Sequence, residues 1–221
     1  MLTAKKSAWF ETVFRLYNRN LLRRRFSSLR VRNLQSLADN ELPTIVYANH
    51  SSWWDGLVCY ELFKRADSDM FVMMEQENLR RYPLFRKLGA FSVDRNNARS
   101  ALASIEYAAN VAKQKRRRAI LIFPQGKIQH SRSRPFEFES GIVRLVERLA
   151  PCRVVPLALS YEFGREFKPE IFAAIGEGLV AGPGENPISR AGLAAQLTSE
   201  LDNLELALNN DQFDDYVDLL R

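Results

Sequence analysis

Residues 44–65 read TIVYANHSSWWDGLVCYELFKR, an apolar run followed by a polar turn and then by a second apolar-rich segment. Thr44–Ala48 is mostly apolar, which is typical of a strand that is covered on both faces of a sheet. Gly56–Arg65 carries its apolar residues at the three- and four-residue intervals of a helix. This stretch therefore predicts a buried strand, a turn and a helix in succession.

The same alternation of strand and helix patterns continues along the chain. Further strands are expected at Met70–Met74, Phe91–Val93, Ala119–Phe123, Val154–Leu159 and Ile171–Ile175, and further helices at Asn78–Leu88, Asn96–Lys113, Ser140–Leu149 and Ile188–Leu208. Ala181–Pro187 is rich in Gly and Pro and predicts a turn region. Alternation of this kind implies right-handed crossovers. We predict an α/β fold whose mostly parallel central sheet is flanked by helices, in a single domain over residues 34–221.

Composition excludes several classes of protein. With 221 residues, 46% of them hydrophobic and 26% charged, the chain is neither disordered nor collagen-like. No apolar run approaches the ~18 residues that a spanning helix needs, which excludes a multi-span membrane protein. Cys59 and Cys152 lack metal-ligand spacing and predict buried thiols in a reducing compartment, so no metal is expected. The basic clusters Arg23–Arg25 and Lys115–Arg118 are short and lack a recognised motif, so no nucleic-acid partner is expected.

Residues 1–33 form a basic, amphipathic segment, the N-terminal arm. The arm contains nine basic residues and one acidic residue, a charge of +8, whereas the whole chain carries +6. Within Trp9–Phe26 the apolar residues recur at helical spacing, and arginines at every fourth position from Arg15 to Arg23 occupy another face. Such a helix suits the headgroup region of anionic lipid and predicts a peripheral protein on the cytoplasmic face of a membrane. The alternative is a first helix that packs its aromatic face on the domain.

The candidate catalytic residues follow the first predicted strand. His50 falls at the carboxyl end of that strand, where α/β proteins place their sites, and Asp55 falls five positions later at the start of the next helix. A turn between them brings the carboxylate back to one imidazole nitrogen, which fixes the tautomer and leaves the other nitrogen as a base. Alternatively, Asp55 is an ordinary helix cap and His50 a structural residue.

Two further blocks of polar residues also follow strands. Arg95 lies just beyond Phe91–Val93, and an arginine can bind phosphate oxygens with two hydrogen bonds. The sequence Phe123-Pro124-Gln125-Gly126-Lys127 forms a turn beyond the next strand, where glycine permits a close approach of the backbone to a ligand. Taken separately, these are an ordinary loop arginine and an ordinary turn glycine. Their order after His50 favours a common site.

In this order the blocks resemble the glycerolipid acyltransferase superfamily, which includes the 1-acylglycerol-3-phosphate acyltransferases. The resemblance covers roughly residues 40–160 and is carried by His50 with Asp55, by Phe91–Arg95, by Phe123–Gly126 and by Val154–Pro156. It implies transfer of a fatty acyl group from acyl-CoA or acyl carrier protein to a hydroxyl of a lysophospholipid or related lipid. It also implies His50 as general base, Asp55 as its partner and no cofactor beyond the acyl donor. The residues implied in substrate binding are Arg95, Phe123, Pro124, Gln125, Gly126 and Lys127.

The third block departs from the pattern of the family. Gln125 stands where the family usually has Glu, Lys127 where it has Thr, and Ile128 where it has Arg. The glutamine loses a charge, and the isoleucine loses a phosphate-binding guanidinium. Two alternatives therefore stay open. The protein acylates a non-phosphate lipid alcohol such as a glycolipid, or it is a catalytically silent lipid-binding relative. A serine hydrolase is disfavoured, because the sequence contains no Gly-x-Ser-x-Gly elbow.

Overall fold

The computed structural model describes residues 1–38, 41–164, 166–182 and 188–221. In these ranges a nine-stranded sheet has the order β4-β3-β5-β2-β6-β7-β1-β9, and β8 pairs with β6 outside this path. The strands are β1 (Leu29–Arg32), β2 (Thr44–Ala48), β3 (Asp69–Glu75), β4 (Ala90–Val93), β5 (Arg118–Ile122), β6 (Cys152–Glu162), β7 (Glu170–Ile175), β8 (Leu179–Ala181) and β9 (Tyr216–Asp218). The central strands β2 to β6 are mutually parallel, and β7, β8 and β9 add the antiparallel pairings.

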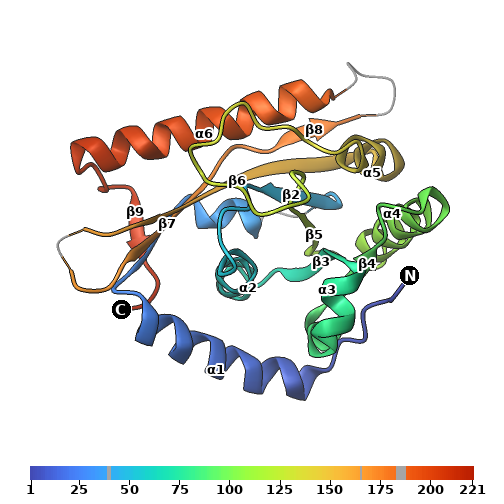
Figure 1. Cartoon of the computed structure of the whole chain (residues 1–221), viewed down its shortest axis with the longest axis horizontal. Helices are drawn as coiled ribbons and strands as arrows, with labels where there is room; N and C mark the ends of the chain where they lie inside the picture. The colour runs from blue at the N-terminus through green and yellow to red at the C-terminus, as the bar shows by residue number, and fades with distance from the viewer. Residues whose placement is uncertain (39–40, 165, 183–187) are drawn as a thin grey trace.

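Helices cover both faces of this sheet (Figure 1). They are α1 (Ala8–Arg25), α2 (Asp55–Arg65), α3 (Gln76–Arg81), α4 (Ala98–Lys113), α5 (Gly141–Leu149) and α6 (Arg190–Asn210), with the 3-10 turns η1 (Leu34–Leu37) and η2 (Pro83–Leu88). One core cluster packs α4, α5 and α6 on one face of the sheet. A second cluster packs α1 and α2 on the opposite face. The predicted α/β fold with a mostly parallel, helix-flanked sheet is confirmed.

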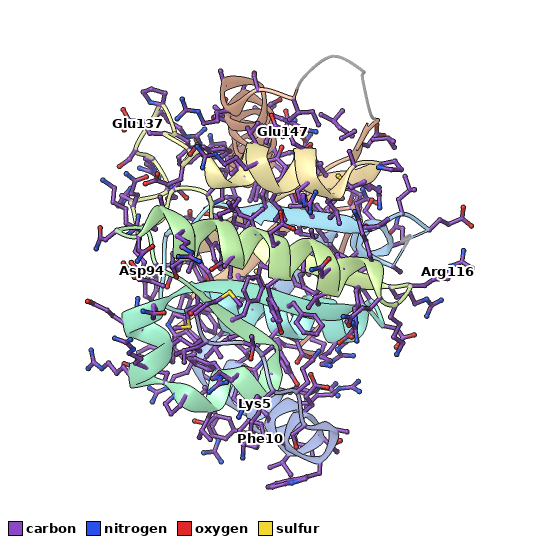
Figure 2. All side chains as sticks on the ribbon, turned by 90° about the vertical axis from the view of Figure 1, so that its right-hand side faces the viewer. Lys5, Phe10, Asp94, Arg116, Glu137 and Glu147 are labelled. Carbon is purple, nitrogen blue, oxygen red and sulfur yellow. The ribbon has the colours of Figure 1, made fainter. Side chains whose placement is uncertain are left out.

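Parallel alignment of the central strands collects their carboxyl ends at one edge of the sheet. Figure 2 shows Asp94, which follows β4, and Arg116, which precedes β5, on opposite sides of the molecule. They mark the carboxyl and amino edges, respectively. Chemistry-bearing side chains that directly follow β2, β4 and β5 therefore share the carboxyl edge, where ligands of open α/β sheets bind.

Most predicted elements are present with small shifts at their ends. The predicted helix Asn78–Leu88 is instead divided into α3 and η2, and Pro83 lies at the break. Proline lacks a backbone N–H and disfavours helical geometry in the residue before it. The short strands β1, β8 and β9 were not predicted, and β1 brings part of the N-terminal arm into the sheet beside β7. Of the predicted turn region, residues 183–187 lie outside the described residues.

Helix α1 has two apolar stripes with different environments. The inner stripe faces α2, where the ring centroids of Phe14 and Tyr60 are 5.1 Å apart and Asn18 Nδ2 donates to the Leu57 carbonyl over 3.1 Å. The outer stripe is exposed and consists of Trp9, Val13, Leu16 and Tyr17. None of the helices in the described ranges combines the length and apolar character needed to cross a bilayer.

Candidate active site

The structure brings His50 and Asp55 together at the carboxyl end of β2. Their side chains meet with 2.7 Å between His50 Nδ1 and Asp55 Oδ2. Because a carboxylate can only accept, Nδ1 carries the proton of this hydrogen bond. The Asp55 side chain is fully buried, whereas the His50 side chain is 24% exposed. The ring therefore keeps Nε2 for a group arriving from solvent.

The Asp55 carboxylate accepts three further hydrogen bonds. Oδ2 accepts from the backbone N–H groups of Ser51, at 2.7 Å, and Ser52, at 2.9 Å. Oδ1 accepts from the Tyr161 hydroxyl at 2.6 Å. Since a buried carboxylate is stable only when its oxygens are paired, these donors hold the group in one orientation. Asp55 thus organises the turn before α2 and contacts the imidazole at the same time. It is not the helix cap of the alternative interpretation, because α2 begins after Trp54 without a side-chain cap.

Tyr161 reaches the pair from the far end of β6, 106 residues along the chain from Asp55. Burial and the neighbouring Asp55 carboxylate raise the pKa of its hydroxyl well above the usual value, so the group stays protonated and continues to donate. Tyr161 is not among the residues predicted from the sequence. It belongs to no motif, and only its place at the end of a strand next to β2 could have drawn attention to it.

The backbone of His50 is held at both of its polar groups. Its N–H donates to Gln125 Oε1 over 2.6 Å, and its carbonyl accepts from the Gln129 N–H over 2.8 Å. Gln125 Nε2 donates to Gln129 Oε1 over 2.9 Å and so links the two contacts. The Gln125 side chain is 4% exposed, and its amide is used inside the protein. A glutamate at this position has no donor to offer Gln129.

Phe123, Pro124 and Gly126 shape the same turn. The Phe123 ring stacks on the His50 imidazole with 4.4 Å between centroids, which fixes the plane of the imidazole, and Pro124 is buried. Gly126 has a φ of +69°, and its N–H closes the turn on the Phe123 carbonyl over 3.0 Å. This positive φ strains any residue with a Cβ, so the turn favours glycine, and a Cβ here would also displace the Arg95 guanidinium. Lys127 follows as an exposed cation.

Arg95 lies between two carboxylates. Its guanidinium is 3.2 Å from Glu75 Oε1 at the end of β3 and 3.5 Å from Glu139 Oε1 before α5. The Arg95 side chain is 38% exposed. The three side chains together carry one net negative charge, so a phosphate at this guanidinium must compete with both glutamates. Arg95 is predicted from its place after a strand, but Glu75 and Glu139, which are 20 and 44 residues away along the chain, are not.

Both cysteines are buried, Cys59 in α2 and Cys152 at the start of β6. Burial raises the pKa of the Cys152 thiol to about 11 and that of the Cys59 thiol well above its usual value, so neither is a ready thiolate. In the part of the chain that the structure describes, no group of three or more His, Cys, Asp or Glu side chains could hold a metal ion.

Comparisons with known proteins identify a family and a similar fold. A family model described as Acyltransferase matches residues 28–160, a range that contains His50, Asp55, Arg95 and the Phe123–Lys127 turn. The fold is similar to the crystal structure of the 1-acyl-sn-glycerophosphate (LPA) acyltransferase PlsC from Thermotoga maritima. The TM-score is 0.65 and the identity 15%, over 90% of this chain and 79% of that one. A comparison with curated proteins finds no match.

Proposed function

The chain belongs to the acyltransferase family, and we propose that it moves a fatty acyl group from acyl-CoA or acyl carrier protein to a hydroxyl of a lysophospholipid or related lipid. The proposal rests on one observation. His50 Nδ1 lies 2.7 Å from the carboxylate of the buried Asp55, and the imidazole remains partly exposed. That arrangement is the one in which a histidine acts as a general base.

In the proposed reaction His50 Nε2 takes the proton of the acceptor hydroxyl as its oxygen attacks the thioester carbonyl. A carbon–oxygen bond forms, the carbon–sulfur bond breaks, and the imidazolium returns the proton to the leaving thiolate. Asp55 stabilises the imidazolium between these steps, and Tyr161 and the two backbone N–H groups hold Asp55 in place. General-base assistance of this kind is typically worth ~10²–10⁴ in rate. The thioester supplies the activated acyl group, so the transfer needs no resident cofactor.

A second candidate is acylation of a lipid alcohol that carries no phosphate. Arg95, the cation that the resemblance assigns to phosphate, is held by Glu75 and Glu139. Ile128 stands where the family usually has an arginine, and its side chain is 54% exposed. Both observations lower the positive charge available to a phosphate beside the site and favour an uncharged acceptor.

We also propose that the protein binds peripherally to an anionic membrane surface through α1. The outer stripe of Trp9, Val13, Leu16 and Tyr17 is exposed, and Arg23–Arg25 add positive charge at the end of the helix. Removing the whole arm is a poor test, because Leu22 and Phe26 are buried in the core. The variant Trp9→Ser with Leu16→Ser keeps the inner stripe and is expected to lose pelleting with anionic vesicles. Leu102→Ser, an exposed leucine on α4, is the control and should pellet as wild type.

The proposed activity is tested by incubating the protein with acyl-CoA and a lipid extract and identifying, by mass spectrometry, which head group gains an acyl mass. His50→Ala under the same conditions gives the background. Release of free fatty acid without an acceptor would instead indicate a hydrolase. Absence of any acylated product, with either acyl-CoA or acyl carrier protein as donor, would indicate a catalytically silent relative.

A further inference from the structure

The segment that joins α3 to η2 is an exposed tip with basic, aromatic and apolar side chains. The tip consists of Arg80–Leu84, with the sequence Arg-Arg-Tyr-Pro-Leu, and all of its residues are exposed. Leu84 is 55% exposed. A single exposed apolar side chain is common on a protein, but several that lie together indicate a contact surface.

The tip lies beside the beginning of α1. The Lys5 N–H donates to the Arg86 carbonyl over 2.8 Å, and the Ser7 N–H donates to the Lys87 carbonyl over 3.1 Å. Lys87 Nζ lies 5.2 Å from the centroid of the Phe10 ring on α1. Figure 1 shows the segment of α3 and η2 directly above the first turns of α1, and Figure 2 shows Lys5 and Phe10 together at the same end of the molecule.

Aromatic contacts attach the tip and the outer stripe of α1 to the same part of the core. The ring centroids of Trp9 and Phe10 are 6.0 Å apart on α1, and those of Tyr82 and Phe85 are 5.9 Å apart on η2. Phe10 and Phe85 both pack against the core cluster that also holds α1 and α2. The exposed rings of Trp9 and Tyr82 therefore belong to the same face of the sheet.

The sequence around the tip is positively charged. Residues 78–93 contain Arg80, Arg81, Arg86 and Lys87 and no acidic residue, a charge of +4. Tyrosine is enriched at the headgroup level of membranes, where its ring is buried and its hydroxyl stays in water. Each cation close to an anionic lipid surface adds to the attraction. The composition of the tip therefore complements an anionic bilayer, as that of α1 does.

The tip is also close to the candidate active site along the chain. Glu75, which pairs with Arg95 at 3.2 Å, is the last residue of β3, and α3 begins at the next residue. α3 has six residues and a length of ~9 Å, so one short helix connects the carboxyl edge of the sheet with the tip. A bilayer at the tip would thus lie near the edge that carries His50.

We propose that Arg80–Leu84 is a second membrane contact, which binds the surface of an anionic bilayer together with the outer stripe of α1. Tyr82 and Leu84 enter the headgroup region, and Arg80 and Arg81 face the lipid phosphates. Two separate contacts define the orientation of the protein on the bilayer, whereas a single helix leaves it free to turn about the helix axis. The inference rests on the membrane binding through α1 that is proposed above.

The first test removes the apolar part of the tip. Tyr82→Ser with Leu84→Ser is expected to weaken binding to vesicles of phosphatidylglycerol and phosphatidylcholine about tenfold, because less apolar surface leaves water on binding. Leu102→Ser with Leu206→Ser is the matched control, since both are exposed leucines on helices of the opposite face, α4 and α6. It should bind as wild type. Sedimentation with the vesicles measures binding, and circular dichroism reports whether the fold is kept.

The second test removes the charge of the tip. Arg80→Gln with Arg81→Gln should weaken binding to the same vesicles about thirtyfold, at about 1 kcal/mol for each cation near an anionic surface. Binding to phosphatidylcholine alone should change by no more than about twofold. Arg116→Gln is the control, because this exposed arginine lies at the amino edge of the sheet, on the opposite side of the molecule from Asp94 (Figure 2).

A third measurement locates the tip relative to the lipid. Cys59 and Cys152 are buried, so a thiol-reactive fluorophore labels the variant Leu84→Cys selectively. On vesicle binding its emission should shift to the blue, and lipids with brominated acyl chains should quench it. Leu206→Cys is the matched control, because Leu206 is 58% exposed, and its label should show neither change.

The proposal is wrong if Tyr82→Ser with Leu84→Ser binds vesicles as tightly as wild type, or if the label at position 84 does not respond to binding. In that case a loss of binding in Trp9→Ser with Leu16→Ser leaves α1 as the membrane contact. If the wild type does not bind vesicles, both membrane proposals fail. A changed oligomeric state with unchanged vesicle binding would make the tip a contact between copies and also overturn the proposal. None of these measurements uses acyl transfer, so they decide the tip even if the proposed reaction fails.

Discussion

His50 and Arg95 both follow a strand at the carboxyl edge of the sheet, but their side chains have different partners. His50 offers one ring nitrogen to a buried carboxylate and keeps the other at a partly exposed position. Arg95 is more exposed, at 38%, but its guanidinium faces two glutamates of the same chain. The imidazole thus keeps one nitrogen for a group arriving from solvent, whereas the guanidinium is paired within the protein. Exposure alone would have ranked the two residues in the opposite order.

The largest effect is expected from His50→Ala, which removes the proposed base and leaves Asp55 and its hydrogen-bond donors in place. The value of kcat should fall by about 10²–10⁴, the usual worth of general-base assistance. Acyl transfer is measured against a panel of lipid acceptors, and circular dichroism reports whether the fold is kept. Retention of more than about a tenth of the wild-type rate contradicts the assignment of His50.

Asp55→Asn is expected to have the second-largest effect, a loss in kcat of about 10²–10³, because the amide can stabilise the wrong imidazole tautomer. Because His50 Nδ1 and the N–H groups of Ser51 and Ser52 all contact Oδ2, an amide that turns its NH2 toward His50 also loses these two donors, and one that keeps its oxygen there loses the charge that stabilises the imidazolium. Steady-state kinetics should show the loss in kcat with little change in KM. Near-normal turnover would reduce Asp55 to a residue that organises the start of α2.

The contacts at this edge of the sheet also differ in whether the sequence alone can predict them. Asp55 is five residues from His50, so a single turn joins them, and their spacing after a strand predicts this contact with a helix cap as the alternative. Tyr161, Glu75 and Glu139 reach the site through the order of the strands in the sheet. Their distances along the chain carry no information about that order.

The strands of the sheet also differ in this way, because some are predicted from their own residues and others depend on their pairing partners. The strands with long apolar runs were predicted, because burial on both faces leaves a continuous signal. The short strands β1 and β9 gain their structure from pairing with each other and with β7. Gln125 was correctly placed at the turn, but the direction of its amide depends on Gln129 and on the backbone of His50.

Tyr161→Phe should lower kcat less than Asp55→Asn does. It should also shift the pH–rate profile, which loss of a merely structural residue would not do. Loss of the hydroxyl leaves Asp55 Oδ1 without this donor, so the carboxylate attracts the His50 proton more strongly. We expect kcat to fall about fivefold, the equivalent of ~1 kcal/mol for one hydrogen bond. The acidic limb of the pH–rate profile should move to higher pH, because the base must be unprotonated to act.

Tyr47→Phe is the matched control for that experiment. Tyr47 is a buried tyrosine on β2 whose hydroxyl donates to Gln196 Oε1 over 2.6 Å, on the face of the sheet that packs α6. Its removal should lower the free energy of unfolding by ~1 kcal/mol and leave the pH–rate profile in place. A shift of the profile in both variants, or in neither, would deny Tyr161 a positioning role.

Arg95→Gln should have the smallest effect and tests the other half of the comparison. Partly exposed ion pairs contribute ~0–1 kcal/mol, so loss of the contacts with Glu75 and Glu139 should change the unfolding free energy by no more than that. For an uncharged acceptor, kcat/KM should stay within about twofold of wild type, because the guanidinium is occupied by the protein itself. Lysophosphatidate is the informative second acceptor. If its KM rises about tenfold or more in Arg95→Gln, the phosphate displaces both glutamates on binding, and Arg95 then belongs with His50 among the residues that face the substrate.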